Sequence, residues 1–164
     1  MPKIRVAVLD TGPLIHLGEV GFSRALNVVE KIVLSDEVIH EFGVGSPLPK
    51  NAIRRDLEKV SKDLATLLME EFGIGPGEAT AIALARQEGI RLLFTDDLDA
   101  REVAHQYGLE PHGTLAMVVR AFRENVLSKG DAIKCVEKLR SASTLYLTSD
   151  LVRWTRKQIE EHGQ

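Results

Sequence analysis

The sequence predicts an α/β fold in three layers, α/β/α, around a central parallel sheet of four to five strands. Short apolar runs rich in β-branched residues alternate with longer segments of helical pattern, as in parallel sheets connected by crossover helices. The chain has 164 residues, of which 44% are hydrophobic, and this is enough to fill one core. We therefore expect residues 1–164 to form a single domain.

The first strand is predicted at 4–9. These residues are mostly apolar, which is typical of a strand buried on both faces of a parallel sheet. Pro13 favours a helix directly afterwards, because proline suits the first helical turn. Thr11 or Gly12 is expected to cap this helix.

The middle of the chain predicts a second strand at 31–34, followed by a short helix over 35–42. The charged helical pattern of 51–72 predicts two helices with a break near Ser61. A further helix over 76–87 is apolar on nearly every side, so we expect it to pack closely against the sheet.

The last part of the chain continues the alternation of strand and helix. The expected elements are a strand at 91–95, a helix that ends at Gly108, a fourth strand at 109–112, a helix from Thr114 to about 126, a helix over 131–139, an edge strand at 145–147 and a final helix over 149–160.

Charge and composition exclude several classes of protein. With 21 Lys and Arg against 24 Asp and Glu, the formal charge is −3, which argues against a general nucleic-acid coat. Any nucleic acid must therefore be held by local basic patches or through metal ions. Cys135 is the single cysteine, so no internal disulfide forms. No apolar stretch predicts a membrane span and the first residues do not read as a signal peptide, so we expect a cytoplasmic protein with no membrane partner.

Acidic residues follow two of the predicted strands. Asp10 comes directly after the first strand, and Asp96 and Asp97 end the third. Open α/β sheets bind ligands at the carboxyl ends of their strands, so these positions are candidate site residues. Taken singly, each also fits the more common role of a helix cap.

Two further acids strengthen the functional interpretation. Glu41 lies late in the short helix over 35–42, and Glu78 lies in the first turn of an otherwise apolar helix. The alternative interpretations are a solvated carboxylate and simple stabilisation by the helix dipole. If folding brings the acids together, their mutual repulsion favours a hard cation, and oxygen ligands without a Cys or His cluster suit Mg²⁺ or Mn²⁺.

The sequence resembles the PIN-domain nucleases (PilT N-terminus), close to the VapC-type toxins. Five segments carry the resemblance in the family's order: VLDTGPLIHL at 8–17, LSDEVIHEF at 34–42, GPGEATAIALA at 75–85, LLFTDDLDAREVA at 92–104 and HGTLAMVVRAF at 112–122. The resemblance implies a parallel sheet with helices on both sides and metal-dependent hydrolysis of RNA phosphodiester bonds. It also implies the toxin half of a toxin–antitoxin pair, with an antitoxin protein as partner, and a homodimer.

The resemblance also assigns the site. The catalytic and metal-binding quartet falls on Asp10, Glu41, Glu78 and Asp96, and it would bind Mg²⁺ or Mn²⁺. Asp97 is the neighbouring acid that supports or replaces Asp96. Three residues are expected in supporting roles: Thr11 as the hydroxyl that steadies the first acid, Arg101 as a structural ion pair rather than a phosphate contact, and Thr114 as a helix cap.

Three departures from the family pattern keep a second hypothesis open. Gly12 stands where Ser is usual, Thr80 where relatives often carry Glu, and Leu98 where a basic residue is common. They favour a catalytically weak or inactive PIN-like module that binds RNA or a protein partner. Gly12 also argues against a haloacid-dehalogenase-like phosphatase, which needs a second Asp at that position.

The last helix carries the remaining candidates. Arg153, Arg156 and Lys157 lie close to Trp154, a pattern that could contact single-stranded RNA, although packing in the core or at a dimer contact is the more common role of such a Trp. The histidines have no ligand spacing and are assigned no chemistry: His16, His40, His105, His112 and His162.

Overall fold

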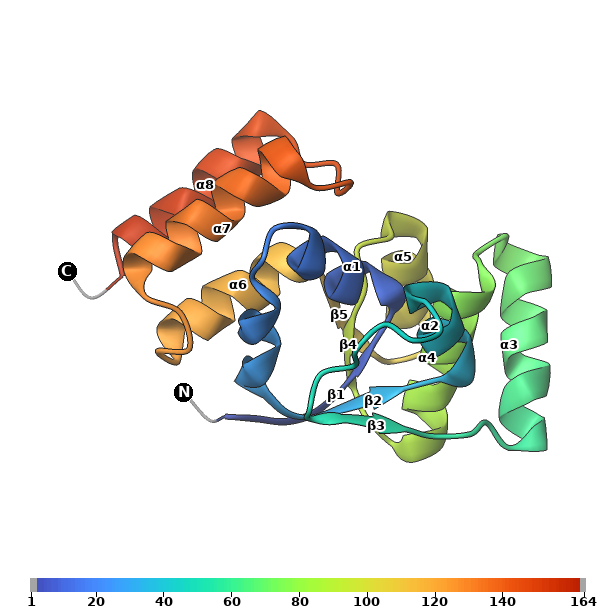
Figure 1. Ribbon diagram of the computed structural model, residues 1–164. Helices are drawn as coiled ribbons and strands as arrows, with labels where there is room; N and C mark the ends of the chain where they lie inside the picture. The colour runs from blue at the N-terminus through green and yellow to red at the C-terminus, as the bar shows by residue number, and fades with distance from the viewer. Residues whose placement is uncertain (1–2, 163–164) are drawn as a thin grey trace.

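The computed structural model describes residues 3–162 and has one sheet of five parallel strands flanked by helices (Figure 1). This confirms the predicted three-layer α/β/α fold. The strands lie in the order β3-β2-β1-β4-β5. Their bounds are β1 Ile4–Leu9, β2 Val29–Leu34, β3 Ala52–Arg54, β4 Leu92–Phe94 and β5 Glu110–His112.

The helices account for most of the rest of the chain. They are α1 Thr11–Glu19, the 3-10 helix η1 Ser23–Val28, α2 Asp36–Phe42, α3 Lys59–Phe72, α4 Pro76–Glu88, α5 Leu98–Gln106, α6 Thr114–Arg123, α7 Lys129–Ala142 and α8 Ser149–Glu160. Within residues 3–162, no helix combines the length and the apolar character needed to cross a membrane.

The central strand β1 determines which strand ends are neighbours in the sheet. It pairs with β2 on one side and with β4 on the other, and its last residues Val8 and Leu9 are fully buried. The backbone N–H of Asp10 still donates to the carbonyl of Phe94 at 2.9 Å. The carboxyl ends of β1 and β4 are therefore neighbours at the point where the strand order reverses, which is where open α/β sheets bind ligands.

The structure corrects the elements expected at 51–72 and at 145–147. Residues 51–58 are not helical, because Ala52–Arg54 form the edge strand β3 on β2, followed by an irregular segment up to α3. A three-residue edge strand is held by backbone pairing, which leaves little trace in the side-chain pattern. Helix α3 then runs unbroken through Ser61. Residues 145–147 form no strand but an irregular segment between α7 and α8.

The structure decides between the caps expected for α1 and corrects the one expected for α6. Asp10, rather than Thr11 or Gly12, caps α1 by accepting a hydrogen bond from the Thr11 N–H at 2.7 Å. Gly113 occupies the cap position of α6, so Thr114 is its first helical residue and its hydroxyl is used elsewhere. Several neighbouring residues at a helix start carry groups that could cap it, and only the backbone dihedral angles decide which residue takes the cap position.

Helix α4 packs as its apolar pattern predicts. All its residues from Ala79 to Ala85 are buried, and it contacts α2, α3, β1 and β4. Small alanine side chains allow this close approach to the sheet. The first turn of the helix, which carries Glu78, faces the carboxyl ends of the strands.

Candidate active site

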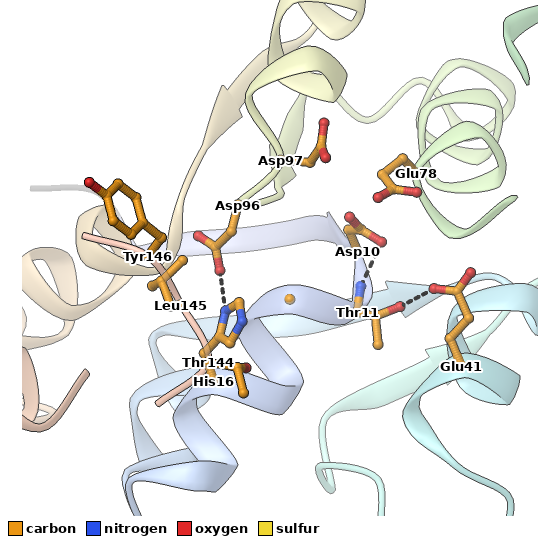
Figure 2. A pocket seen from close by; sticks show the side chains of 11 residues that line it. Asp10, Thr11, His16, Glu41, Glu78, Asp96, Asp97, Thr144, Leu145 and Tyr146 are labelled. Carbon is orange, nitrogen blue, oxygen red and sulfur yellow. Dashed lines mark hydrogen bonds and ion pairs between the residues drawn. The ribbon is translucent and has the colours of Figure 1, made fainter. Parts of the chain in front are cut away.

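One pocket of about 280 Å³ collects the five acids singled out by sequence (Figure 2). Its acidic lining residues are Asp10, Glu41, Glu78, Asp96 and Asp97, and the rest of the lining comes from Thr11, Gly12, His16, Thr144, Leu145 and Tyr146. The acids come from the ends of β1 and β4, from α2 and from the first turn of α4. The fold thus brings together side chains that are far apart in the sequence.

Asp10 lies at the bottom of the pocket and is only 5% exposed. One carboxylate oxygen accepts from the Thr11 N–H at 2.7 Å and the other from the Thr95 hydroxyl at 2.9 Å. Burial raises the pKa of Asp10 to about 6, and the negative charges of Glu78 and Glu41 act in the same direction, while the two hydrogen bonds oppose them.

Glu41 reaches the pocket from the end of α2. Its carboxylate accepts from the Thr11 hydroxyl at 2.8 Å and from the Gly77 N–H at 2.9 Å. A Cβ atom at Gly77 would overlap Glu41 Oε2, so only glycine allows this approach. Thr11 therefore contacts both Asp10, through its backbone, and Glu41, through its side chain.

Glu78 and Asp97 face each other across the mouth of the pocket (Figure 2). Burial raises the pKa of Glu78, and the charges of Asp97 and Glu41 add to the effect. Asp97 is exposed, and one of its oxygens caps α5 by accepting from the Ala100 N–H at 2.8 Å. Within residues 3–162, no cationic side chain pairs with the carboxylate of Asp10, Glu41, Glu78 or Asp97.

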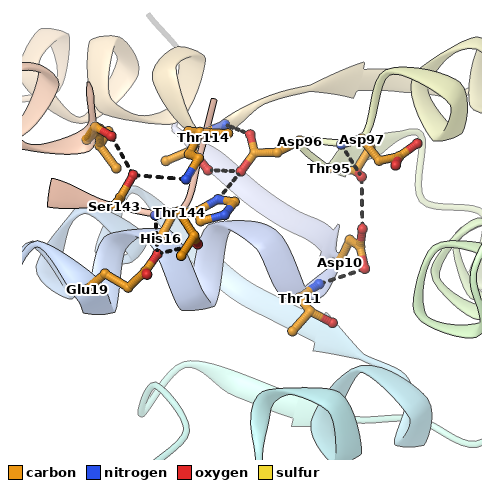
Figure 3. A network of polar contacts seen from close by, with 12 residues as sticks. Asp10, Thr11, His16, Glu19, Thr95, Asp96, Asp97, Thr114, Ser143 and Thr144 are labelled. Atoms are coloured by element: carbon orange, nitrogen blue, oxygen red, sulfur yellow. Dashed lines mark hydrogen bonds and ion pairs between the residues drawn. The ribbon is translucent and has the colours of Figure 1, made fainter. Parts of the chain in front are cut away.

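Asp96 is in a different environment from the other four acids (Figure 3). Its Oδ1 accepts from the Thr114 N–H at 2.7 Å, and its Oδ2 lies 2.5 Å from the Thr114 hydroxyl and 2.7 Å from His16 Nδ1. Burial favours its protonated form, but the hydrogen bonds from His16 and Thr114 outweigh burial and hold the pKa of Asp96 below its ordinary value. Both of its oxygens are therefore engaged by protein donors.

Arg101 and Gly113 complete the surroundings of Asp96. Arg101 Nε donates to the Thr95 carbonyl at 2.9 Å, and its Nη2 lies 3.8 Å from Asp96 Oδ1. A Cβ atom at Gly113 would overlap Arg101 Nη2, so glycine makes room for the guanidinium. These contacts accord with the structural ion pair expected for Arg101.

The departures from the family pattern fall in different places. Gly12 lines the pocket, and a Cβ atom there would lie 3.1 Å from Asp96 Oδ2. Thr80 is buried outside the pocket, with its hydroxyl donating to the Pro76 carbonyl at 2.8 Å. Leu98 is 74% exposed and does not line the pocket.

Sequence reasoning missed His16 and the segment around Tyr146. His16 was assigned no chemistry, although it lies one helical turn after Gly12 and therefore on the same face of α1 as that residue of the strand-end motif. This spacing could have identified it. Thr144, Leu145 and Tyr146 line the pocket from the segment between α7 and α8, and no local pattern points to them.

The carboxylates surround the pocket without meeting at one point. Over residues 3–162, no group of three His, Cys, Asp or Glu side chains has the close spacing of a preformed metal site. The arrangement is an open ring of anionic oxygens, with Asp10 at its base and Glu78, Asp97 and Glu41 around it.

A parallel α/β sheet with an acidic pocket at the carboxyl ends of its central strands defines a class of domains that bind ligands at that edge. The chain belongs to the PIN-domain family, because the family model DUF3368, described as a PIN domain, matches residues 6–161. This confirms the resemblance seen in the sequence. PIN domains are generally nucleases and typically use divalent metal ions. Comparison with curated proteins and with solved structures found no match.

Proposed function

We propose that this PIN domain is a metal-dependent endoribonuclease that hydrolyses RNA phosphodiester bonds with Mg²⁺ or Mn²⁺ in the acidic pocket. The observation that carries the proposal is that four carboxylates without an ion-pair partner in the described chain line a single pocket. Four unneutralised acids in one place repel each other, and the raised pKa values of Asp10 and Glu78 express that repulsion together with burial.

The donor set fits a hard divalent cation. All four groups offer oxygen, the ligand that Mg²⁺ and Mn²⁺ prefer, whereas Cys135 is buried in the core and His16 is engaged by Asp96. Mg²⁺ usually keeps several waters and takes only one or two protein carboxylates. A wide ring of acids therefore suits a hydrated ion better than a closed cage of ligands would.

The contacts favour Asp97 over Asp96 as a ligand. The family pattern assigns Asp10, Glu41, Glu78 and Asp96, with Asp97 supporting or replacing Asp96. Asp96 has three hydrogen-bonding contacts, with Thr114 and His16, and Arg101 beside it, whereas Asp10 has two donors and no cation beside it. We therefore assign the metal to Asp10, Glu78 and Asp97, with Glu41 beside them. Asp96 then acts as a positioning residue that joins α1 to α6.

The residues of the pocket have different roles in the proposed reaction. A bound divalent ion would lower the pKa of a coordinated water and neutralise charge on the phosphate. Thr11 and Thr95 hold the Asp10 carboxylate in one orientation, and Thr11 also holds Glu41. One of the pocket carboxylates would accept the proton from the attacking water.

The experiment that tests the proposal is cleavage of single-stranded RNA by the purified protein with Mn²⁺ or Mg²⁺. Asp10→Asn and Asp97→Asn should each abolish cleavage, and EDTA should do the same to the wild type. Asp99→Asn is the matched control, because Asp99 is an exposed acid of α5 that does not line the pocket. RNA cleavage that persists in EDTA would refute the metal-dependent mechanism.

Calorimetry separates this proposal from the inactive-module hypothesis. A nuclease should bind Mn²⁺ in the millimolar range or tighter, and Asp10→Asn should remove that binding. RNA binding without any divalent-ion binding would favour a PIN-like module that has lost turnover.

We also propose the toxin role, the antitoxin partner and the homodimer that the family resemblance implies. Leu151 and Trp154 support a dimer contact, because both are exposed apolar residues one turn apart on α8. Trp154 therefore does not pack in the core. Light scattering should give twice the 18.1 kDa mass of one chain, and a mass near 18.1 kDa would refute the dimer.

A further inference from the structure

Tyr146 is an aromatic side chain left without partners at the edge of the acidic pocket. It is 86% exposed, and within residues 3–162 no hydrogen bond or ring contact engages its side chain. Figure 2 shows it at the rim beside Asp96. A large apolar surface exposed next to a functional pocket is more informative than one exposed elsewhere.

The outward position of Tyr146 is determined by its neighbours. Along the segment 143–148, Ser143, Leu145 and Leu147 are half-buried, and the residues between them are exposed. Leu145 and Leu147 pack against the core on the inner side. In an extended segment successive side chains point to opposite sides, so the two leucines direct Tyr146 away from the protein.

The segment is also fastened to the wall of the pocket. Glu19, at the end of α1, accepts from the Thr144 N–H at 3.1 Å and from the Thr144 hydroxyl at 2.8 Å (Figure 3). The Leu145 N–H donates to the Ser143 hydroxyl at 3.1 Å. The backbone that carries Tyr146 is therefore held in place, so a ligand that uses the ring does not have to order the segment first.

The surface beyond Tyr146 changes from acidic to basic. The segment 143–148 leads into α8, where a second pocket of about 440 Å³ lies between α7 and α8. Its charged lining is mostly basic: Arg140, Arg153, Arg156 and Lys157, with Glu160 and Glu161. Arg140 donates to the Ser149 hydroxyl at 2.7 Å, and Arg153 pairs with Asp150 on the surface. Exposed pairs of this kind contribute little stability, so these arginines can exchange partners for phosphates.

We propose that Tyr146 is a stacking platform for an unpaired RNA base next to the phosphate held in the acidic pocket. This inference rests on the proposed nuclease function and adds a residue that would hold the substrate strand beside the site of cleavage. A tyrosine ring stacks on any base, because every base has a π face, but the base must be free of its own helix. The protein should therefore bind and cleave single-stranded RNA in preference to duplex.

Binding is measured by fluorescence anisotropy with a fluorescein-labelled 12-nucleotide single strand in Mg²⁺. Phosphorothioate linkages in the strand slow its cleavage while the wild-type metal site stays intact, and Tyr146→Ala, Tyr146→Phe and Phe72→Ala are each compared with the wild-type parent. Stacking on one base predicts a rise in Kd of about 5- to 100-fold for Tyr146→Ala. Tyr146→Phe keeps the ring and should bind like the parent. Phe72→Ala is the matched control, since Phe72 is an exposed aromatic of α3 outside the pocket.

Two further measurements make the readout specific to stacking. In the otherwise wild-type protein, Tyr146→Ala should raise KM for the single strand more than it lowers kcat. A blunt-ended duplex of the same length should lose little affinity, because its paired bases cannot stack on the ring. Circular dichroism should show an unchanged fold for Tyr146→Ala, as expected for so exposed a side chain.

The outcomes separate this inference from the nuclease proposal. If Tyr146→Ala binds the single strand as tightly as the parent, if it loses duplex affinity equally, or if the parent binds neither RNA, the stacking role is wrong. If the wild type cleaves and Tyr146→Ala has an unchanged KM, the nuclease proposal stands alone. If the wild type does not cleave but Tyr146 controls single-strand binding, the stacking role stands without the nuclease.

Discussion

At the scale of single residues, Asp10 and Asp96 show how the surroundings give one side-chain type two roles. Both are largely buried acids directly after a strand. Asp10 has two hydrogen-bond donors and no cation beside it, and its pKa rises to about 6. Asp96 has His16, Thr114 and Arg101 around it, and its pKa falls. We infer that Asp10 is available to a metal ion and that Asp96 is not.

Asp10→Asn should stabilise the metal-free protein. A carboxyl group whose pKa is raised in the folded state lowers stability as pH rises from its unfolded value of 3.8 to about 6, and the loss is complete above that. Asparagine has no charge and can still bond Thr11 and Thr95. We expect a gain of about 1–3 kcal/mol at pH 8 and little change at pH 4, from urea unfolding in EDTA. A variant less stable than wild type at pH 8 would contradict this reasoning.

Metal affinity should increase as pH rises from 5 to 7. Because a metal ion binds the ionised carboxylate, binding must release the proton that Asp10 holds below a pKa of about 6. Titration calorimetry with Mn²⁺ at pH 5, 6 and 7.5 should show tighter binding at each step. Proton release should be largest near pH 5. Affinity that is independent of pH over this range would mean that Asp10 is not a ligand.

At the scale of elements, the pocket depends on contacts between helices that start beside the sheet. Asp96, at the end of β4, joins α1 through His16 and α6 through Thr114. Glu41 joins α2 to the first turns of α1 and α4 through Thr11 and Gly77. These polar contacts determine how the starts of the helices are oriented toward one another around the pocket. The apolar core stabilises the packing of the helices but does not by itself set this orientation.

Asp96→Asn and Asp97→Asn should separate stability from metal binding. Asp96→Asn removes charge from a buried network and leaves one donor from Thr114 or His16 unpaired, so we expect a loss of about 1–3 kcal/mol at pH 7. The depressed pKa predicts that this difference disappears as pH falls below about 4. Asp97→Asn keeps the cap on α5, since asparagine caps as well as aspartate, and should remain stable while losing metal affinity. The reverse pattern in unfolding and calorimetry would restore Asp96 as the ligand.

Gly77→Ala should reduce activity through Glu41. The added Cβ atom would overlap Glu41 Oε2, so the carboxylate must leave its hydrogen bond to the Gly77 N–H. We expect RNA cleavage under saturating substrate to slow by about tenfold or more, the effect of one lost charge-assisted hydrogen bond. Gly130→Ala is the control, because Gly130 in α7 has nothing within 4 Å of its added Cβ. That variant should be fully active and slightly more stable.

At the scale of the whole molecule, the pocket is lined by residues from the first two thirds of the chain and from a segment near its C-terminus. The acids come from residues between Asp10 and Asp97, but the rim comes from the segment before α8, which Glu19 fastens to α1. The hairpin of α7 and α8 lies beside α6 in Figure 1 and carries this segment to the pocket. The C-terminal helices therefore take part in the site and are not only a cover for the core.

Glu19→Ala should loosen the rim and leave the core intact. Both hydrogen bonds to Thr144 are lost, and because they are exposed the loss of stability should stay below about 1 kcal/mol. Amide hydrogen exchange at 143–148 should accelerate while the strands stay protected. RNA affinity should also fall, since Tyr146 would no longer be held in position. Unchanged exchange at Thr144 would show that the two leucines alone hold the segment.

The sequence predicted the parallel sheet, the buried helix α4 and the acids at the strand ends, because each leaves a local signal. A strand buried on both faces reads as an apolar run, and an acid after such a run lies at the ligand-binding edge. Edge strand β3 left no such signal, since backbone pairing with β2 holds its three residues. The cap at Asp10 was one of several alternatives that the sequence offered, because neighbouring positions carry equivalent hydrogen-bonding groups.

The alternation of buried strands and helices, the five candidate acids and membership of the PIN-domain family were thus determined by the amino-acid sequence itself. Only the tertiary structure decided that Asp96 is engaged by His16 and Thr114 while Asp97 faces Glu78, and that Tyr146 stands at the rim. The physical reason is that the partners of a side chain are set by packing between segments distant in sequence. Two adjacent aspartates are chemically identical until the fold gives one of them donors and leaves the other facing acids.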